Sequence, residues 1–294
     1  MRAFLAFILL MAAALVAGAL LAYPVYELGQ ALDADWPFHR VASRVAMLML
    51  LVGFLLLVRR LGLANRASLG YGVQRPKWMR LAALSLLIGA VSMLPVVCIL
   101  LALGIRTPVP DIDATTVASV LLTGLLSGIV VAFVEETFLR GAMFTAIERE
   151  SGATVAIGLT AFIYAALHFL NRAKIPADQV SAGSGIDLLA GTLDTLANPV
   201  AIVDSFLALF AVGVLLALVR ARTGNIAACV GLHAGWVWMI AITRELTRRD
   251  PTSEWAQLVG SYDGIVGYFV FGWTVLMVTA AFFILPPAAP AGRQ

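Results

Sequence analysis

The segment Val131-Ala-Phe-Val-Glu-Glu-Thr-Phe-Leu-Arg-Gly141 places two adjacent carboxylates at the end of an apolar run that begins near Val117. An ionised carboxylate inside a lipid bilayer costs roughly 3 kcal/mol or more, and two neighbouring ones also repel each other. Arg140 follows Glu136 by four residues, so in a helix it lies on the same face and compensates this charge. The segment therefore predicts a membrane helix with a functional polar site. The alternative is a helix that ends at the surface with a solvated acidic turn.

The overall composition is that of a membrane protein. Of the 294 residues, 61% are hydrophobic and 13% are charged, and the mean hydropathy is +0.95. Soluble domains carry roughly 25% charged residues. The formal charge of +3 comes from short basic loops, without a Lys/Arg run that would bind nucleic acid. Cys98 and Cys229 fall in apolar runs and are expected to pack there. The sequence predicts an all-α polytopic membrane protein with no soluble domain.

Apolar windows of about 20 residues mark spanning helices. Eight segments qualify, at 3–23, 43–58, 81–104, 116–147, 153–170, 200–220, 224–243 and 263–285. The fourth exceeds what a bilayer requires and should tilt or project beyond the surface. Glycine should break the chain near Ser151-Gly152, and the long connection 171–198 should hold a short helix over 186–196. We expect three regions: helices at 1–114, a functional helical core at 115–243, and a loop, last helix and tail at 244–294.

The charges of the loops predict the orientation. The second connection carries six basic residues and no acidic one, namely Arg59, Arg60, Arg66, Arg75, Lys77 and Arg80. The connections after the first, third and fifth spans are acidic instead. The positive-inside rule then places both termini in the cytoplasm, although Arg244, Arg248 and Arg249 follow the seventh span against this trend.

Three polar positions are expected to form one site. The fourth helix carries Glu135, Glu136 and Arg140, the fifth carries Tyr164 and His168 four residues apart, and the seventh carries His233. Glu135 lies 16 residues before Ser151 and His168 lies 16 after Gly152, so two unbroken helices would bring both side chains to the same depth.

The residue types indicate hydrolysis. A carboxylate beside an imidazole activates a water molecule for attack on a carbonyl, and a second imidazole stabilises the oxyanion. Glu135, His168 and His233 are also suitable zinc ligands, but the usual HExxH pattern is absent, so we expect no cofactor and keep zinc as an alternative. Each histidine taken alone could instead be hydrogen-bonded to a neighbouring helix without a catalytic role.

The motif Glu135-Glu136-x-x-x-Arg140, followed by histidines in two later helices, resembles the CAAX proteases and bacteriocin-processing enzymes of the CPBP family over about residues 115–240. His233-Ala-Gly-Trp236 is similar to the bacterial branch. The resemblance implies an intramembrane endopeptidase of an inner membrane that cuts a hydrophobic or lipid-modified, CAAX-like peptide. It implies that Glu135 and His168 activate water, that Arg140 organises the acidic turn, and that His233 serves the oxyanion site.

Two departures from the family pattern affect these expectations. Tyr164 replaces a Phe, and Val237 replaces an Asn four residues after His233. Losing such a donor costs on the order of 100-fold in rate, unless an indole N–H of Trp236 or Trp238 substitutes. One alternative is therefore a non-catalytic relative used in bacteriocin self-immunity or as a partner scaffold. A proton-coupled transporter is less favoured, because no repeat or pair of broken helices is evident. Membrane lipid is the other expected partner, and the sequence does not specify an oligomeric state.

Overall fold

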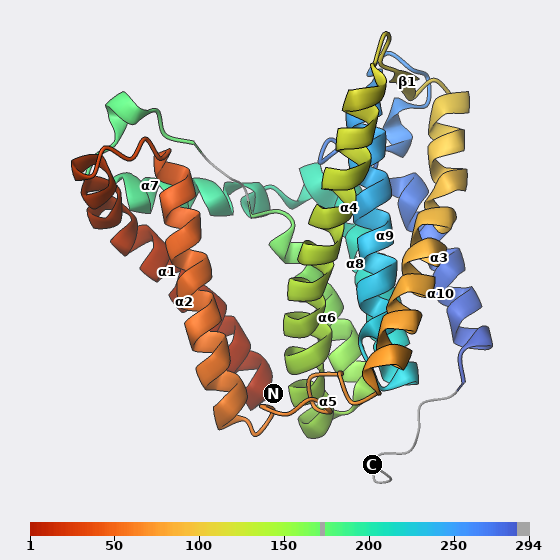
Figure 1. The fold of residues 1–294 in the computed structure, drawn as a ribbon, viewed down its shortest axis with the longest axis horizontal. Coiled ribbons are helices and arrows are strands. Elements are labelled where there is room, and N and C mark those ends of the chain that lie inside the picture. The colour runs from red at the N-terminus through yellow and green to blue at the C-terminus, as the bar shows by residue number, and fades with distance from the viewer. Residues whose placement is uncertain (171–173, 287–294) are drawn as a thin grey trace. The chain divides into compact units, whose positions relative to one another are not determined.

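The computed structural model describes residues 1–170 and 174–286, and this part of the chain is almost entirely helical (Figure 1). The α-helices are α1 (Arg2–Ala31), α2 (Phe38–Arg60), α3 (Arg75–Ala102), α4 (Ala114–Glu136), α5 (Phe144–Ser151), α6 (Ala153–Leu167), α7 (Ser184–Leu193), α8 (Val203–Thr223), α9 (Ala227–Leu246) and α10 (Tyr268–Ile284). A π-helical turn, η1 (Thr137–Met143), joins α4 to α5. Short 3₁₀ turns cover η2 (Ala177–Gln179), η3 (Asp194–Ala197), η4 (Pro199–Ile202) and η5 (Ala256–Leu258).

Each of the eight predicted spans coincides with a helix. Among the described residues, six helical segments are long and apolar enough to cross a membrane, and α6 and α10 are shorter apolar helices of 15 and 17 residues. The chain is a multi-pass, all-α membrane protein, as the composition predicts. The short helix expected over 186–196 is also present, as α7 followed by η3. The tail at 287–294 lies outside the described residues.

The helices gather into two compact units. The first comprises Met1–Ala64 and Ala166–Ala201, and the second comprises Asn65–Ala165 and Ile202–Gln294. This grouping follows packing, whereas the boundaries near 115 and 243 follow sequence motifs, so the three regions expected from the sequence stay a prediction.

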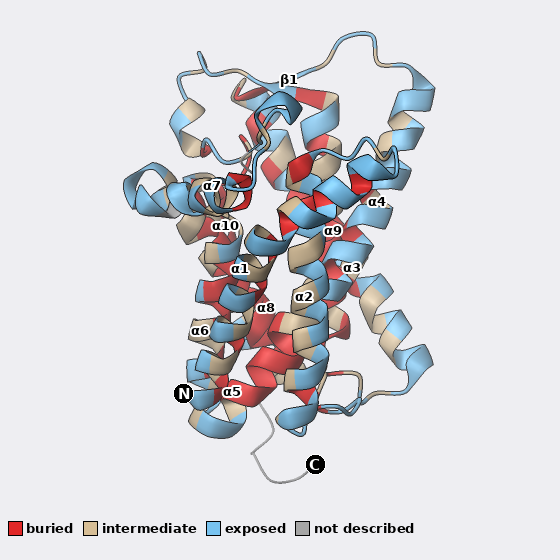
Figure 2. Ribbon diagram, turned by 90° about the vertical axis from the view of Figure 1, so that its left-hand side faces the viewer, coloured by how far each residue is buried: buried red, intermediate tan, exposed pale blue. Residues whose placement is uncertain are grey.

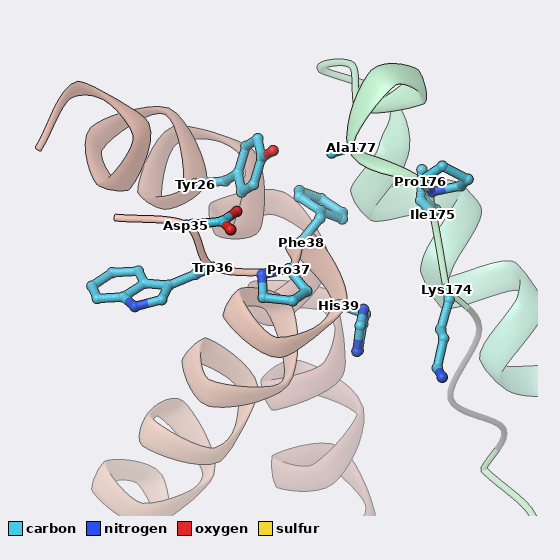
Figure 3. A pocket seen from close by; sticks show the side chains of 10 residues that line it. All are labelled: Tyr26, Asp35, Trp36, Pro37, Phe38, His39, Lys174, Ile175, Pro176 and Ala177. Atoms are coloured by element: carbon cyan, nitrogen blue, oxygen red, sulfur yellow. The ribbon is translucent and has the colours of Figure 1, made fainter. Parts of the chain in front are cut away.

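In the first unit, α1 and α2 pack against each other around Ala22, Tyr26, Phe38, Val41 and Ala42. The rings of Tyr26 and Phe38 meet edge to face, with centroids 5.6 Å apart. A cavity of about 370 Å³ opens beside this core, between the start of α2 with the turn before it and the segment Lys174–Ala177 (Figure 3). None of its lining residues belongs to the predicted site.

In the second unit, α9 packs against both α3 and α4 (Figure 1). Gly231 and Gly235 of α9 lie so close to the α3 backbone that an added Cβ would collide with the carbonyl oxygens of Ala82 and Leu86. Small residues at this spacing let membrane helices approach closely, where dispersion rather than water exclusion drives association. The same approach fixes the position of His233, which lies between the two glycines in the sequence. Buried residues concentrate on α5, α8 and α9 (Figure 2).

A two-stranded antiparallel sheet closes one end of the second unit. Its strands are β1 (Arg106–Pro108) and β2 (Thr247–Arg249), with Arg106 opposite Arg249. The buried guanidinium of Arg106 donates to the Thr247 carbonyl at 2.8 Å and to the Gly264 carbonyl at 3.1 Å. These bonds tie the connections before α4 and after α9 together.

The fourth predicted helix is confirmed as one continuous helical segment, Ala114–Ser151, but it contains the π turn. The side chain of Asp113 caps its start by accepting from the backbone N–H of Thr116 at 2.9 Å. The segment ends where the sequence predicts, because Gly152 adopts a positive φ of 83° that a residue with a Cβ rarely tolerates.

Candidate active site

Glu136 is the buried centre of the polar cluster. Its side chain is 0% exposed, and its Oε1 atom lies 3.0 Å from Nη1 of Arg140 and 2.9 Å from Nδ1 of His233. The ion pair with Arg140 confirms the i,i+4 pairing expected from the sequence. A charged donor and a ring nitrogen both reach this carboxylate, and their contacts offset the cost of burying its charge.

Arg140 connects the cluster to two further helices. Its second terminal nitrogen donates to the Gly213 carbonyl of α8 at 3.2 Å, and its guanidinium carbon lies 4.7 Å from the centre of the Tyr164 ring of α6. An added Cβ on Gly213 would lie 2.7 Å from the Cα of Ala161, so this glycine lets α8 approach α6 closely. The side chain of Arg140 therefore contacts groups from α4, α6 and α8.

His233 lies between the two glutamates. While Nδ1 contacts Glu136, Nε2 faces Oε2 of Glu135 at 4.0 Å, which is too long for a direct hydrogen bond. The Tyr164 ring packs edge to face against the imidazole, with centroids 5.7 Å apart. An ionised carboxylate can only accept, so the contact with Glu136 is a hydrogen bond in the form of His233 that carries a proton on Nδ1.

The two adjacent glutamates occupy different environments. The side chain of Glu135 is 36% exposed, whereas that of Glu136 is fully enclosed. The neighbours of Glu135 on α4 include Val130, Phe133 and Val134, which expose their apolar side chains. Of the two carboxylates, only that of Glu135 is accessible from outside the protein, and exposed apolar side chains lie close to it in the sequence of α4.

His168 lies in the turn directly after the last residue of α6, and its side chain is partly buried. It falls in the first compact unit, whereas the glutamates fall in the second. The approach of His168 to Glu135 that the sequence predicts therefore stays a prediction. Five of the other six predicted site residues lie close together in the structure, namely Glu135, Glu136, Arg140, Tyr164 and His233.

The sixth residue, Trp236, directs its indole N–H to the Ser92 hydroxyl of α3 at 3.0 Å. The neighbouring Trp238 donates to the Leu121 carbonyl of α4 at 2.9 Å. Both indoles anchor α9 to the helices beside it, and a role of Trp236 as an oxyanion donor stays a prediction.

The donors around the site do not form a metal-ligand set in the part of the chain that the structure describes. Across these residues, no group of three or more His, Cys, Asp or Glu side chains could hold a metal ion. Zinc at Glu135, His168 and His233, the alternative that the sequence offers, stays untested, and we derive no step through a metal.

The loop before α3 also contacts the segment that follows the two glutamates, which the sequence did not predict. The Tyr71 hydroxyl bonds to the hydroxyl of Thr137, the residue after Glu136, at 2.5 Å. Burial raises the pKa of the Tyr71 phenol above its ordinary value, so the hydroxyl keeps its proton at neutral pH. An added Cβ on Gly141 would lie 2.8 Å from the Leu69 carbonyl, which shows how closely this loop packs on the π turn.

Residues 117–239 match the family described as Rce1-like, type II CAAX prenyl endopeptidase. This segment belongs to the Rce1-like family. Searches of the curated proteins and of the solved structures found no match. The matched range agrees with the resemblance expected over about 115–240, and it contains all five residues that the structure brings together. The Rce1-like segment thus coincides with the polar cluster, and its family is one of CAAX-type intramembrane proteases.

Proposed function

We propose that the protein is an intramembrane endopeptidase that hydrolyses a peptide bond in a hydrophobic or lipid-modified, CAAX-like peptide. The observation that carries this proposal is the partly exposed Glu135 carboxylate facing Nε2 of His233, whose other ring nitrogen is held by Glu136. The family of the segment supplies the class of reaction.

The charges of the cluster favour a donor role for His233. Glu135 and Glu136 each contribute −1 and Arg140 contributes +1, so a doubly protonated His233 brings the formal charge of the four groups to zero. A neutral total is favourable where little water is present to solvate an excess charge. In this state Nδ1–H donates to Glu136, and Nε2–H is available for a developing oxyanion.

The proposed reaction runs through Glu135. Its carboxylate takes a proton from a water molecule as the water oxygen forms a bond to the scissile carbonyl carbon. The carbonyl oxygen becomes an oxyanion that accepts from Nε2–H of His233. The protonated Glu135 then gives its proton to the leaving nitrogen as the C–N bond breaks, which yields a carboxylic acid and an amine. In this scheme His168 orients the water together with Glu135.

The surroundings of Glu135 support an apolar substrate. The exposed side chains of Val130, Phe133 and Val134 on α4 face outward into what the composition indicates is lipid. Val131, which lies one helical turn before Glu135 on the same face of α4, is also exposed, so we propose that a peptide with a hydrophobic or prenyl group approaches Glu135 from the lipid side of this helix. The resemblance of His233-Ala-Gly-Trp236 to the bacterial branch supports a bacterial inner membrane, and the charges of the loops support the orientation with both termini in the cytoplasm.

The test is cleavage of farnesylated and unmodified CAAX peptides by the purified protein in liposomes, with products identified by mass spectrometry. The matched variants are Glu135→Gln and, as control, Glu254→Gln, which alters an exposed glutamate outside the cluster. We expect the wild type and Glu254→Gln to release the C-terminal fragment, and Glu135→Gln to lose at least 100-fold in rate. Cleavage at an unchanged rate by Glu135→Gln would refute the proposed base.

A second candidate is a non-catalytic membrane protein of the same fold, which acts in self-immunity or as a scaffold. Val237 favours it, because an apolar side chain stands where the family usually has Asn four residues after His233. This candidate predicts that no peptide is cut and that Glu135→Gln leaves the cellular phenotype intact.

A further inference from the structure

Arg220 is a buried cation that the reaction described above does not use. It lies near the end of α8 and is 6% exposed. Its Nε–H donates to the backbone carbonyl of Arg140 at 3.0 Å, and one terminal nitrogen donates to the Thr145 hydroxyl at 3.1 Å. Its guanidinium also lies 5.6 Å from the centre of the Phe144 ring. These contacts are all with neutral groups, so Arg220 is not held by a direct ion pair among the described residues.

One acceptor of Arg220 lies within the π turn, at Arg140, and the other lies two residues after its end, at Thr145 of α5. Arg140 and Thr145 are five residues apart, and in this segment the N–H of Phe144 bonds to the Leu139 carbonyl, also five residues back. π turns are rare, because the wider spacing gains less from packing than an α turn, and they concentrate at functional sites. A planar guanidinium with fixed donor directions can hold the π turn and the start of α5 at this spacing, which a lysine ammonium cannot.

The π turn contains the residue that organises the polar cluster. Arg140 belongs to η1, and its side chain reaches back to Glu136, whose Oε1 also contacts His233. The i,i+4 spacing of Glu136 and Arg140 is that of an ordinary helix, whereas the contact of Arg140 with the Gly213 carbonyl depends on where the π turn places the Arg140 backbone. The position of His233 relative to Glu135 depends on this chain of contacts.

We propose that Arg220 is a positioning residue that maintains the π turn and so holds Glu136 and His233 in the geometry of the site. It touches no reacting atom, and it acts through the backbone of Arg140. The kinetic part of this inference rests on the proposed peptidase function, whereas the structural part does not.

The experiment compares Arg220→Gln and Arg220→Lys with Arg222→Gln. Arg222 is the matched control, because it lies on the same helix turn but contacts the Phe282 ring and the Leu285 carbonyl instead of the π turn. The chain has three histidines, so ¹⁵N-histidine labelling gives few ring signals, and His233→Gln assigns the one of interest. Intact secondary structure is checked by circular dichroism.

We expect the ring ¹⁵N signals of His233 to shift in Arg220→Gln, to shift less in Arg220→Lys, and to stay in place in Arg222→Gln. With a cleavable peptide, kcat should fall by about 10- to 100-fold in Arg220→Gln while KM stays within about twofold, because misplacement of about 1 Å costs up to 100-fold. Unchanged His233 signals in folded Arg220→Gln, or equal effects of Arg222→Gln, would overturn the inference.

Two further outcomes are separable. If the wild type cuts no peptide, the proposed function fails, and the His233 signals alone decide the role of Arg220. If the Arg220 variants do not fold, Thr145→Val keeps the shape of the side chain but removes its acceptor for Arg220, together with its donation to the Ser68 carbonyl. We then expect a smaller His233 shift in the same direction, and no shift would contradict the inference.

Discussion

Replacing Arg140 by methionine should destabilise the protein strongly, because it leaves a buried charge uncompensated. The substitution removes the 3.0 Å ion pair with Glu136, whose side chain is 0% exposed, and the donation to the Gly213 carbonyl. Breaking one side of a buried pair costs roughly 3–5 kcal/mol, and the lost hydrogen bond adds about 1 kcal/mol. The apolar methionine side chain keeps part of the packing, so most of the loss comes from the stranded carboxylate.

A double-mutant cycle isolates the energy of the interaction between Glu136 and Arg140. In Glu136→Gln/Arg140→Met the stranded carboxylate is absent. We therefore expect the double variant to lose about 2 kcal/mol less free energy of unfolding than the two single variants lose together. Arg75→Met alters an exposed arginine and should change the free energy of unfolding by less than about 0.5 kcal/mol.

The assay is reversible unfolding in mixed micelles with increasing SDS, followed by the fluorescence of the six tryptophans. Additive losses in the double variant, or a loss below about 1 kcal/mol in Arg140→Met, would show that Glu136 and Arg140 are not coupled as the 3.0 Å contact requires.

Three further outcomes are expected. Gly235→Ala should separate α9 from α3 and lower the free energy of unfolding by about 1–3 kcal/mol. The control Gly158→Ala should be tolerated, because its new Cβ would meet nothing within 4 Å, and equal thermal stability of the two variants argues against the close helix approach. Val237→Asn should raise kcat by up to about 100-fold if it restores an oxyanion donor, and an unchanged kcat shows that this position does not serve the oxyanion. Dialysis against a chelator should leave the cleavage rate unchanged, and a loss that zinc restores would reinstate the metal alternative.

The sequence located the helices and the charged pair because both depend on local, periodic properties. Apolar length marks each of the eight segments, and an i,i+4 spacing is enough to pair Glu136 with Arg140. Gly152 marks the break before α6, because few other residues accept its φ of 83°.

The parts that escaped prediction depend on contacts between distant segments. The π turn differs from an α-helix by a small change in spacing that leaves no composition signal. The carbonyl of Gly213 and the guanidinium of Arg220 become partners of Arg140 only when α8 packs against η1. The contact of Nδ1 of His233 with Glu136, rather than with Glu135, likewise depends on how α9 is placed by its glycines.

The central claim is that glutamate and imidazole groups from separate membrane helices meet at one site. Solid-state NMR measures the distance between these groups directly in the protein in lipid bilayers, through the dipolar dephasing of glutamate ¹³Cδ by histidine ring ¹⁵N. With Glu136 Oε1 at 2.9 Å from Nδ1 and Glu135 Oε2 at 4.0 Å from Nε2 of His233, we expect dephasing that is lost in His233→Gln. Equal dephasing in the wild type and in His233→Gln would contradict the account.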